Sequence, residues 1–359
     1  MYIHDYSNKE LYLLHEYLEK EHFKALYDQI EKEGYLIKDF IILSKKLILR
    51  RFLGAVKRRK NIFKSFKVML MEYSKNLKLK CLKDKILIVG IAPYDNLMFK
   101  YKNIFRKNKC IYFTSWQSWD GTVFPKGEYK NKPEFEKILK NNFKACACVS
   151  KETERGIKQF FCHTEVVNHS INLKEYKNKE KCEKNKVTRF IFLGQFIERK
   201  NIAFILKWLE ESSQLNCEFN FAGEGELREE IRDICYKDSR VKLLDKLSKE
   251  QIKSTLKHYD FLVLPSKEEA FGIVLIEALA VGVPCIVSDT LGPKEIITDM
   301  FNGLIFDKFK YDEFKNVMDK ACNIENDEYS YLSNNCIKSS IKYDTSNIVK
   351  KWIKLLNRL

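Results

Sequence analysis

Two carboxylates stand in an apolar stretch of the sequence, residues 265–284, which reads PSKEEAFGIVLIEALAVGVP. Seven residues separate Glu269 from Glu277. An unpaired charge is costly to bury, so the apolar neighbours of Glu277 argue against the alternative in which Glu269 caps a helix and Glu277 faces solvent. Carboxylates accept hydrogen bonds from sugar hydroxyls. We therefore expect both side chains to reach one elongated ligand, one at a sugar and the other at a ribose diol.

The same stretch predicts a strand, a turn and a helix. Phe261–Pro265 is a short apolar run of the kind found in buried strands, and the helix is expected to begin near Phe271 or Gly272. Backbone N–H groups without helical partners and the positive end of the helix dipole favour a phosphate at this terminus. The stretch therefore suits a pyrophosphate beside Glu269.

A second loop carries positive charge. The sequence FLGQFIERKNI, residues Phe192–Ile202, places Gly194 after a predicted strand and the cations Arg199 and Lys200 in the loop that follows. Open α/β sheets bind ligands beyond the carboxyl ends of their strands. These cations therefore either contact an anionic ligand or form an ordinary surface pair, and the loop alone does not decide between the two.

A third loop is rich in glycine. The sequence FAGEGELREE, residues Phe221–Glu230, places Gly223 and Gly225 between a strand and a helix. Glycine allows a backbone to approach a ligand closely and to adopt positive φ. The G-x-G pattern by itself is weak evidence, because it is also frequent in ordinary strand-to-helix turns.

Short apolar runs alternate with helical patterns along the chain, which predicts parallel sheets covered by helices in a doubly wound α/β arrangement. The length of 359 residues favours two domains, and the polar segment Lys174–Lys186 is the expected linker. Asn8–Glu33 has a helical pattern, whereas Phe40–Leu43 fits either a strand or a helix. The expected strands are Ile86–Ile91, Cys110–Phe113, Ala145–Val149, Arg189–Leu193, Glu218–Ala222, Phe261–Pro265 and Cys285–Ser288.

Much of the net charge of +16 lies in one segment. Residues 45–80 contain thirteen Lys or Arg and one acidic residue, with apolar residues interleaved at helical spacing. A basic amphipathic helix of this kind can lie on an anionic membrane surface. A plain basic surface is the alternative, and a nucleic-acid partner is not expected because no nucleic-acid-binding motif accompanies the charge.

Several features of the sequence indicate the cellular compartment of the protein. Eleven cysteines, an odd number without the pattern of a small disulfide scaffold, fit a reducing environment. We see no signal-peptide pattern at the N-terminus, and the longest apolar runs are far shorter than the roughly 20 residues of a spanning helix. The expected location is the cytoplasm, with peripheral binding to the inner face of the plasma membrane.

Two further clusters contain side chains that could bind a ligand or a metal ion. In YFTSWQSWDG, residues Tyr112–Gly121, the side chains of Trp116 and Asp120 could line an acceptor site or pack in a core. Cys146, Cys148 and the nearby pair Cys162–His163 resemble zinc ligands in type. We expect Cys146 and Cys148 to point to opposite faces of a strand, so buried structural thiols are favoured over a metal site.

The motifs GQFIERKN, FAGEGEL, LVLPSKEEAFGIVLIEALAVGVPCIVSD, GPKEII and NGLIF occur in this order over residues 188–307. Together they resemble the retaining glycosyltransferases of family 4, which have the GT-B fold. The resemblance implies two Rossmann-like domains facing across a cleft. The N-terminal acceptor domain would span 1–175, the nucleotide-sugar domain 188–340, and a final helix, 341–359, would return to the first domain.

The resemblance also implies roles for individual residues. Glu269 would contact the donor sugar and Glu277 the ribose, with Lys200 and Arg199 at the diphosphate. Gln195 stands where the family usually has arginine, so the phosphate clamp would either rely on Arg199 beside Lys200 or be weaker. Other donor-binding positions would be Gly194, Gly223, Gly225, Ala270, Phe271, Gly272, Ile273 and Val274, and residues 245–247 would border the nucleobase.

The activity expected from this resemblance is transfer of a sugar, with retained configuration, from a UDP-linked donor to a glycan or lipid-linked acceptor. Such an enzyme would act in surface polysaccharide or glycolipid biosynthesis, with Glu269, Lys200 and Arg199 as catalytic residues. It would need no metal or other cofactor, because cations and a helix terminus would stabilise the leaving diphosphate. A sugar-nucleotide epimerase and a non-catalytic partner subunit of the same fold are the alternatives.

Overall fold

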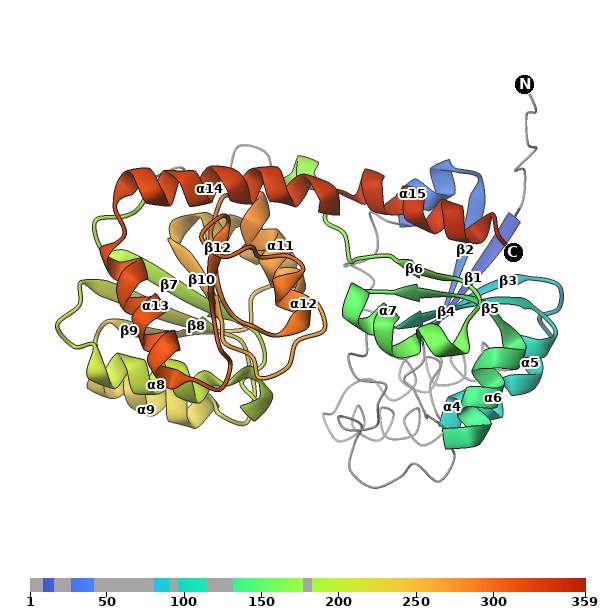
Figure 1. Cartoon of the computed structure of the whole chain (residues 1–359), viewed down its shortest axis with the longest axis horizontal. Coiled ribbons are helices and arrows are strands. Elements are labelled where there is room, and N and C mark those ends of the chain that lie inside the picture. The colour runs from blue at the N-terminus through green and yellow to red at the C-terminus, as the bar shows by residue number, and fades with distance from the viewer. Residues whose placement is uncertain (1–8, 16–26, 42–80, 91–95, 115–131, 177–182) are drawn as a thin grey trace, which may run out of the picture. The chain divides into compact units, whose positions relative to one another are not determined.

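The computed structural model describes residues 9–15, 27–41, 81–90, 96–114, 132–176 and 183–359 (Figure 1). The basic segment 45–80 and the acceptor candidates Trp116 and Asp120 lie outside these residues. The chain divides into two compact units. The first contains Met1–Val149, Thr153–Val167 and Val349–Leu359, and the second contains Ser150–Glu152 and Asn168–Ile348.

The first unit contains a six-stranded sheet in the order β2-β1-β3-β4-β5-β6, in which all neighbouring strands are parallel. The strands are β1 Lys9–His15, β2 Tyr35–Ile41, β3 Ile86–Gly90, β4 Lys109–Thr114, β5 Phe143–Cys148 and β6 Thr164–Val166. Its helices include α4 Asn96–Lys100, α5 Lys102–Arg106, α6 Lys132–Asn142 and α7 Lys151–Ile157. Buried side chains from β3, β4, β5 and these helices form its hydrophobic core.

The helical expectation for Asn8–Glu33 is wrong over its first part. Lys9–His15 forms β1, which pairs with β2 along its whole length and with β3 on its other side. Leu11 is completely buried there. A strand that is buried on both faces has a continuous apolar sequence rather than an alternating one, and so short a run cannot be distinguished from helix by periodicity. β2 includes Phe40 and Ile41, so the ambiguous segment begins as a strand.

The second unit also contains a six-stranded parallel sheet, in the order β12-β11-β10-β7-β8-β9. Its strands are β7 Thr188–Leu193, β8 Cys217–Ala222, β9 Val241–Leu244, β10 Phe261–Leu264, β11 Cys285–Ser288 and β12 Gly303–Phe306. The aromatic ring of Phe190 stacks with those of Phe219 and Phe261 on adjacent strands, at centroid distances of 5.9 and 5.8 Å. The two parallel sheets with their helices confirm the predicted α/β fold class.

The strand order of the second sheet determines where its helices lie. From β7 the chain steps outward to β8 and β9, and it then returns to β10 and steps the other way to β11 and β12. Right-handed crossovers therefore place α8 Ile202–Glu211 and α9 Arg228–Lys237 on one face and α11 Ile273–Ala280 on the other. The direction reverses between β7 and β10. Ligands of open α/β sheets bind at such a reversal, beyond the carboxyl ends of the strands.

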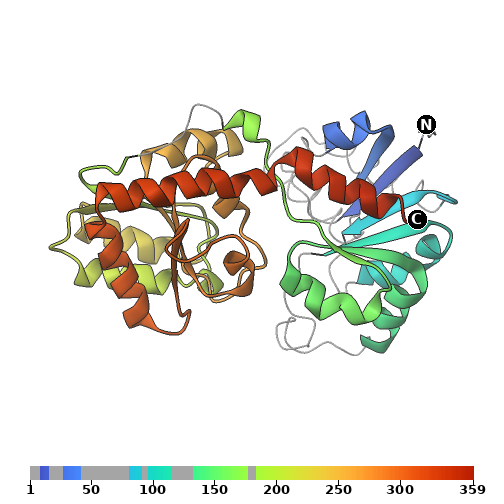
Figure 2. The same ribbon diagram turned by 45° about the horizontal axis from the view of Figure 1, so that its top comes forward.

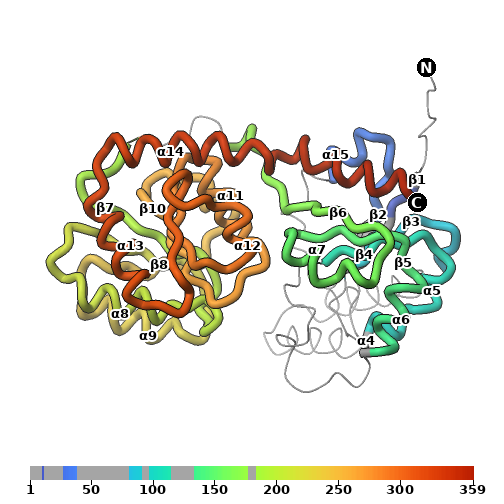
Figure 3. Tube along the Cα trace, viewed as in Figure 1, coloured from blue at the N-terminus to red at the C-terminus, as the bar shows by residue number. Residues whose placement is uncertain are grey.

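Other helices complete the second unit. Helix α14, Asn326–Ser340, packs against α11 (Figure 2). Just after α11, the Gly282 carbonyl accepts a hydrogen bond from the Ser333 hydroxyl at 2.6 Å. The path from β10 through α11 to α12 is clearest in the chain trace (Figure 3). These helices are α10 Lys249–Thr255, α12 Leu291–Lys294, α13 Tyr311–Asn323 and α14 Asn326–Ser340.

The final helix, α15 Thr345–Leu356, groups with the first unit from Val349 onward. The ring of Trp352 lies 5.8 Å from that of Phe113 on β4. Lys354 forms a 2.8 Å ion pair with Glu165 on β6. These contacts tie the end of the chain to the first sheet.

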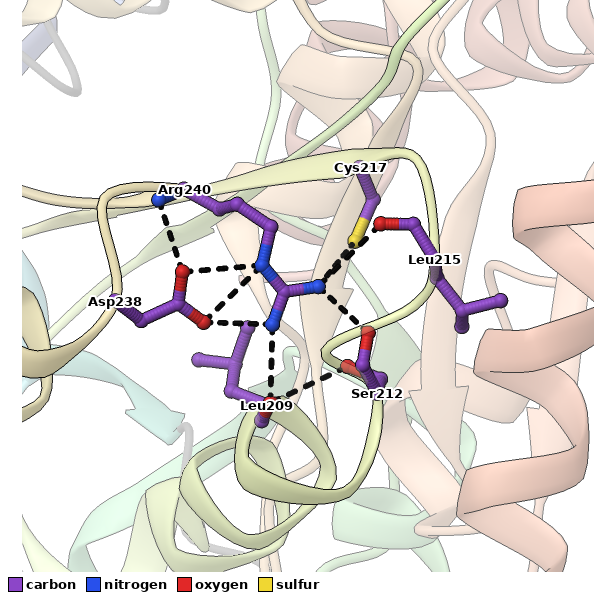
Figure 4. Close-up of polar contacts among 6 residues, drawn as sticks. All are labelled: Leu209, Ser212, Leu215, Cys217, Asp238 and Arg240. Atoms are coloured by element: carbon purple, nitrogen blue, oxygen red, sulfur yellow. Dashed lines mark hydrogen bonds and ion pairs between the residues drawn. The ribbon is translucent and has the colours of Figure 1, made fainter.

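An arginine joins the ends of three elements in the second unit (Figure 4). The Arg240 guanidinium binds the Asp238 carboxylate, with the shortest contact at 2.6 Å. It also donates to the backbone carbonyls of Leu209 and Ser212, at 3.1 and 2.6 Å, and to the Cys217 sulfur at 3.7 Å. Arg240 therefore connects the end of α8 to the starts of β8 and β9.

Within the described residues, every helix is too short or too polar to cross a membrane.

Candidate functional site

An ion pair joins the two loops at the reversal point of the second sheet. Lys200 ends a short 3-10 helix, Glu198–Lys200, after β7, and Glu269 lies in the loop after β10. The Lys200 Nζ contacts Glu269 Oε2, and each side chain is only 12% exposed. Because β7 and β10 are parallel neighbours, their following loops share one edge of the sheet. The structure thus brings together two of the predicted catalytic residues.

Further contacts join the same two loops. Arg199 Nη1 donates to the carbonyl of Glu268 at 3.0 Å, and the Lys267 amide donates to the carbonyl of Arg199 at 2.9 Å. An exposed pair between Lys267 and Glu198, at 3.0 Å, adds to these contacts. The Arg199 side chain is exposed, and a guanidinium has five N–H donors. Arg199 therefore holds the loop while retaining donors for another partner.

Helix α11 begins at the predicted position. Gly272 precedes its first residue and has a left-handed backbone with φ of +85°. A Cβ at this position would lie 2.9 Å from the Leu275 Cδ1, so both the backbone angle and the space favour glycine. Phe271 is buried against Tyr343 and His169, with ring centroids 5.7 and 5.5 Å away. At Phe271 only the backbone is therefore suited to contact a ligand.

The remaining predicted positions of this loop are Ala270, Ile273 and Val274. All three are half-buried, between the enclosed Phe271 ring and the fully buried middle of α11. Their backbone groups lie at the N-terminus of the eight-residue helix α11. That terminus follows Glu269 directly, which gives the site both a carboxylate and helix N–H groups.

Gly292 supports the Glu269 loop from α12. A Cβ at Gly292 would lie 2.4 Å from the carbonyl oxygen of Glu269 and 2.5 Å from the carbonyl carbon of Ala270. Only glycine therefore permits this approach between the two backbones. Gly292 was not among the predicted site residues, although its GPKEII segment contributed to the family resemblance.

The predicted glycines Gly194, Gly223 and Gly225 bring the loops after β7 and β8 into contact. A Cβ at Gly223 would lie 1.9 Å from the carbonyl oxygen of Gly194, and one at Gly225 would lie 2.3 Å from that of Phe196. The Phe196 amide donates to the carbonyl of Glu224 at 2.9 Å. The tight loop contact accounts for the G-x-G pattern without a ligand, so its predicted role in donor binding stays a hypothesis.

Glu277 is buried rather than exposed to solvent. It is 3% exposed in the middle of α11, and the Tyr176 hydroxyl donates a hydrogen bond to its Oε1 at 3.3 Å. Burial raises the pKa of Glu277 to about 7, against the opposing effects of Lys249, the Tyr176 hydroxyl and Lys253. This result excludes the solvent-facing alternative. Glu269 and Glu277 thus have different protein partners.

The residues around Glu277 come from segments that were not predicted to lie near it. Tyr176 follows the 3-10 helix Leu173–Glu175, whereas Lys249 and Lys253 lie on α10. Lys253 forms an ion pair with Glu175. Burial first, and then the nearby Glu277, raise the pKa of Tyr176 well above its ordinary value, so this hydroxyl remains a donor. The sequence contained no spacing signal for this cluster.

Two predicted features lie at the periphery of the site. Asp245, the proposed border of the nucleobase, has a side chain 97% exposed and forms a 3.1 Å ion pair with Arg228. Arg228 also donates to the carbonyl of Gly223 at 2.9 Å. Gln195, which stands where the family usually has arginine, is exposed.

The prediction that Cys146 and Cys148 point to opposite faces of a strand is wrong. Their sulfur atoms are 3.7 Å apart on β5, because residues separated by two positions in a strand share a face. Both thiols are buried, and burial raises the pKa of Cys146 well above its ordinary value. Within the ranges that the structure describes, no three His, Cys, Asp or Glu side chains are grouped in a way that could hold a metal ion.

Residues 174–339 match the family model described as Glycosyl transferases group 1. An uncharacterized glycosyltransferase of Methanocaldococcus jannaschii is 28% identical over 193 residues, which cover 53% of this chain and 51% of that protein. The UDP-Gal:alpha-D-GlcNAc-diphosphoundecaprenol alpha-1,3-galactosyltransferase of Escherichia coli is 28% identical over 197 residues, 52% of this chain and 49% of that protein. The chain thus spans about half the length of these curated relatives.

The fold is similar to that of HepE from Anabaena, whose crystal structure was solved in complex with UDP and glucose. The TM-score is 0.70 at 13% sequence identity, and the alignment covers 98% of this chain and 100% of HepE. A likeness at so low an identity concerns the fold alone. The two parallel sheets thus form a two-domain α/β fold of the GT-B type, and the second unit contains the region that matches the group 1 glycosyltransferase model.

Proposed function

We propose that the protein is a glycosyltransferase that transfers a sugar from a UDP-sugar to a glycan or lipid-linked acceptor. The observation that carries this proposal is the enclosed Lys200–Glu269 pair beside the N-terminus of α11, at the reversal point of the second sheet. The relatives support the choice of substrates. The E. coli relative is named for a UDP-Gal donor and a diphosphoundecaprenol acceptor, and HepE was solved with UDP.

The proposed chemistry depends on the charge that develops on the leaving diphosphate. Lys200, Arg199 and the N–H groups of α11 would stabilise this charge in place. Glu269 would accept hydrogen bonds from the donor sugar and Glu277 from the ribose. In this scheme the transferred sugar retains its anomeric configuration. No metal is required, since fixed cations and helix N–H groups meet the diphosphate charge.

A diphosphate would compete with Glu269 for Lys200. In the described structure Lys200 is already bound to that carboxylate, so donor binding must redistribute the contacts of the lysine. This competition makes the affinity for free UDP sensitive to both residues, in opposite directions. It also connects diphosphate binding to the position of Glu269, the group proposed to contact the sugar.

The proposed acceptor belongs to surface polysaccharide or glycolipid biosynthesis, with Trp116 and Asp120 on the acceptor side. The basic segment 45–80 would hold the protein on the anionic inner face of the plasma membrane. Sedimentation with anionic liposomes tests this location. Replacement of Arg58, Arg59 and Lys60 by Glu should release the protein from the liposomes, and unchanged sedimentation would refute the role of this segment.

Calorimetry and thermal melting with UDP, GDP, ADP and a panel of UDP-sugars test the proposed donor. A ligand that binds only the folded state raises the melting temperature, and UDP is expected to do so in the presence of EDTA. With a suitable lipid-linked or glycan acceptor, release of UDP should accompany formation of a glycosidic bond of retained configuration, which NMR can determine. Absence of UDP binding, or epimerised donor without UDP release, would refute the proposal.

A further inference from the structure

The hydroxyl of Tyr176 is the donor that the protein offers to Glu277. Tyr176 is 2% exposed, and its Oη lies 3.3 Å from Glu277 Oε1 although 101 positions separate the residues. Among the described residues, no other group donates a hydrogen bond to this carboxylate. The phenol of Tyr176 therefore determines the direction in which one of the two oxygens points.

The second oxygen of Glu277 has a different environment. Oε2 accepts no hydrogen bond from the part of the chain that the structure describes, and it is not one of the enclosed side-chain atoms that lack a partner. Part of the 3% residual exposure of Glu277 therefore lies at Oε2. Oε1 thus has a donor in the protein interior, whereas Oε2 has none among the described residues and can accept a hydrogen bond from a ligand.

The titratable groups near Glu277 come from two further elements. They comprise Glu175 and Tyr176 beside the 3-10 helix Leu173–Glu175, and Lys249, Glu250 and Lys253 on α10. The charges of Lys249 and Lys253 favour the carboxylate form of Glu277 but do not orient it. Lys253 is already bound to Glu175, and Lys249 acts on Glu277 through its charge. A charge interaction has little directional preference, whereas the Tyr176 hydrogen bond has a defined geometry.

We propose that Tyr176 is a positioning residue of the donor site, whose hydroxyl fixes Glu277 Oε1 so that Oε2 accepts a hydrogen bond from the ribose diol of the nucleotide. This inference rests on the proposed function, in which Glu277 contacts the ribose. The terminal torsion of a glutamate is broad and roughly two-fold. A hydrogen bond to one oxygen selects a narrow part of that range and orients the other oxygen toward the diol.

The variant Tyr176→Phe tests this role, because it removes the hydroxyl and keeps the buried ring. The probes are UDP and 2′-deoxy-UDP, which lacks one ribose hydroxyl, and binding is measured by calorimetry. The wild type should bind UDP more tightly than 2′-deoxy-UDP. Loss of a hydrogen bond to a charged group should weaken UDP binding about 10-fold. The ratio of the two affinities should also fall toward one, which a general loss of packing would not cause.

The pH dependence gives a second measurement. The Tyr176 hydrogen bond lowers the pKa of Glu277, so its removal raises that pKa. In the wild type, UDP affinity should fall as pH decreases through about 7, where Glu277 takes up a proton. In Tyr176→Phe the same decrease should begin at a higher pH.

The matched control is Tyr329→Phe. Tyr329 is fully buried and donates a hydrogen bond to the carbonyl of Asp260 at the same distance of 3.3 Å, in another part of the second unit. The control should lose comparable thermal stability but keep the wild-type ratio of affinities and pH profile. NMR of isotope-labelled tyrosines provides a measurement on the unmutated chain, in which UDP should shift the Tyr176 signal and leave that of Tyr329 unchanged.

The outcomes separate this inference from the proposed function. If wild-type protein does not bind UDP, the proposed function fails and the role of Tyr176 fails with it. If UDP binds but Tyr176→Phe keeps the wild-type preference over 2′-deoxy-UDP and the same pH profile, only the role of Tyr176 is refuted. An unshifted Tyr176 signal on UDP binding would also refute it.

Discussion

Lys200 and Glu269 form an ion pair across 69 positions of sequence, at the ends of two adjacent parallel strands. Both side chains are 12% exposed, whereas the neighbouring pair of Lys267 and Glu198 is 44% and 85% exposed. Exposed pairs contribute little because solvent screens them and their side chains lose entropy. Removal of one partner from an enclosed pair leaves an uncompensated charge. The Lys200–Glu269 pair is thus the more consequential of the two.

Substitution of either member of this pair should affect UDP binding in opposite directions. Lys200→Met should weaken binding by at least about 10-fold, because a cation is removed from the diphosphate. Glu269→Gln should leave UDP affinity equal or higher, because Lys200 is released from its competitor, while sugar transfer falls. Calorimetry with UDP and an assay of transfer measure these effects separately.

Lys315→Met is the matched control for the lysine substitution. Lys315 forms a 3.0 Å pair with Asp319 within α13, with side chains 32% and 33% exposed. It should change neither UDP affinity nor transfer. Equal weakening of UDP binding in Glu269→Gln and Lys200→Met would contradict the proposed competition.

Glu277 should make the folded protein less stable as pH rises. Its pKa is about 7 in the folded state, above the ordinary value of 4.5 for an exposed glutamate. Between these values the folded state binds more protons than the unfolded state, so the free energy of unfolding decreases with increasing pH and is lowest above about 7. Glu277→Gln should remove this component, and urea denaturation between about pH 5 and pH 8 measures it.

Glu175→Gln provides a comparison of opposite sign. Burial raises the pKa of Glu175, but hydrogen bonds from Lys253 and Asn172 and the charge of Lys253 outweigh burial, so the net pKa is lowered. Its stabilising contribution is present above the unfolded pKa and is lost as pH falls through the folded one. If both variants changed the pH profile in the same direction, the assigned environment of Glu277 would be wrong.

Arg240 should contribute to stability without contributing to UDP binding. It lies at the starts of β8 and β9, whereas the proposed donor site lies beyond the carboxyl ends of the strands. Arg240→Met removes the guanidinium donors from the carbonyls of Leu209, Ser212 and Leu215 and from the Asp238 carboxylate, which keeps the backbone amide of residue 240 as a donor. This loss should cost about 3 kcal/mol of unfolding free energy. Arg232→Met, which breaks the exposed pair with Glu229, should cost less than about 1 kcal/mol. Equal losses of unfolding free energy in the two variants would show that Arg240 contributes no more than an exposed ion pair.

The sequence predicted the second sheet better than the first. The expected strand Cys285–Ser288 coincides with β11, and Phe261–Pro265 differs from β10 by one residue. Both are fully buried apolar runs bounded by turns, which is the clearest signal of a parallel strand. β9 and β12 were not predicted: they have four residues, as β10 and β11 do, but neither is completely buried. Burial depends on neighbouring strands that a local pattern does not specify.

In the candidate site, too, features that depend on neighbouring residues in the sequence could be predicted, whereas contacts between distant residues could not. The start of α11 could be predicted because Gly272 and the apolar helix that follows it are adjacent in sequence. The burial of Glu277 followed from its apolar neighbours. Tyr176 could not be predicted, because 101 positions separate it from Glu277 and only the folded chain joins them. The same reason applies to Gly292, whose close contact is with the backbone of Glu269.

Alanine substitutions at Gly292 and Gly194 should distinguish a residue that supports the site from a residue that contacts the donor. A Cβ at Gly292 would lie 2.4 Å from the carbonyl oxygen of Glu269, so Gly292→Ala must displace backbone and should lower both the melting temperature and UDP affinity. At Gly194 the nearest atom to an added Cβ is in the Phe192 ring, 3.5 Å away, which is an ordinary contact. Gly194→Ala should therefore fold with an unchanged melting temperature. If the Gly194 backbone borders the donor, as the family resemblance implies, the added methyl group should weaken UDP binding without lowering the melting temperature. Unchanged UDP affinity in calorimetry would exclude Gly194 from the site.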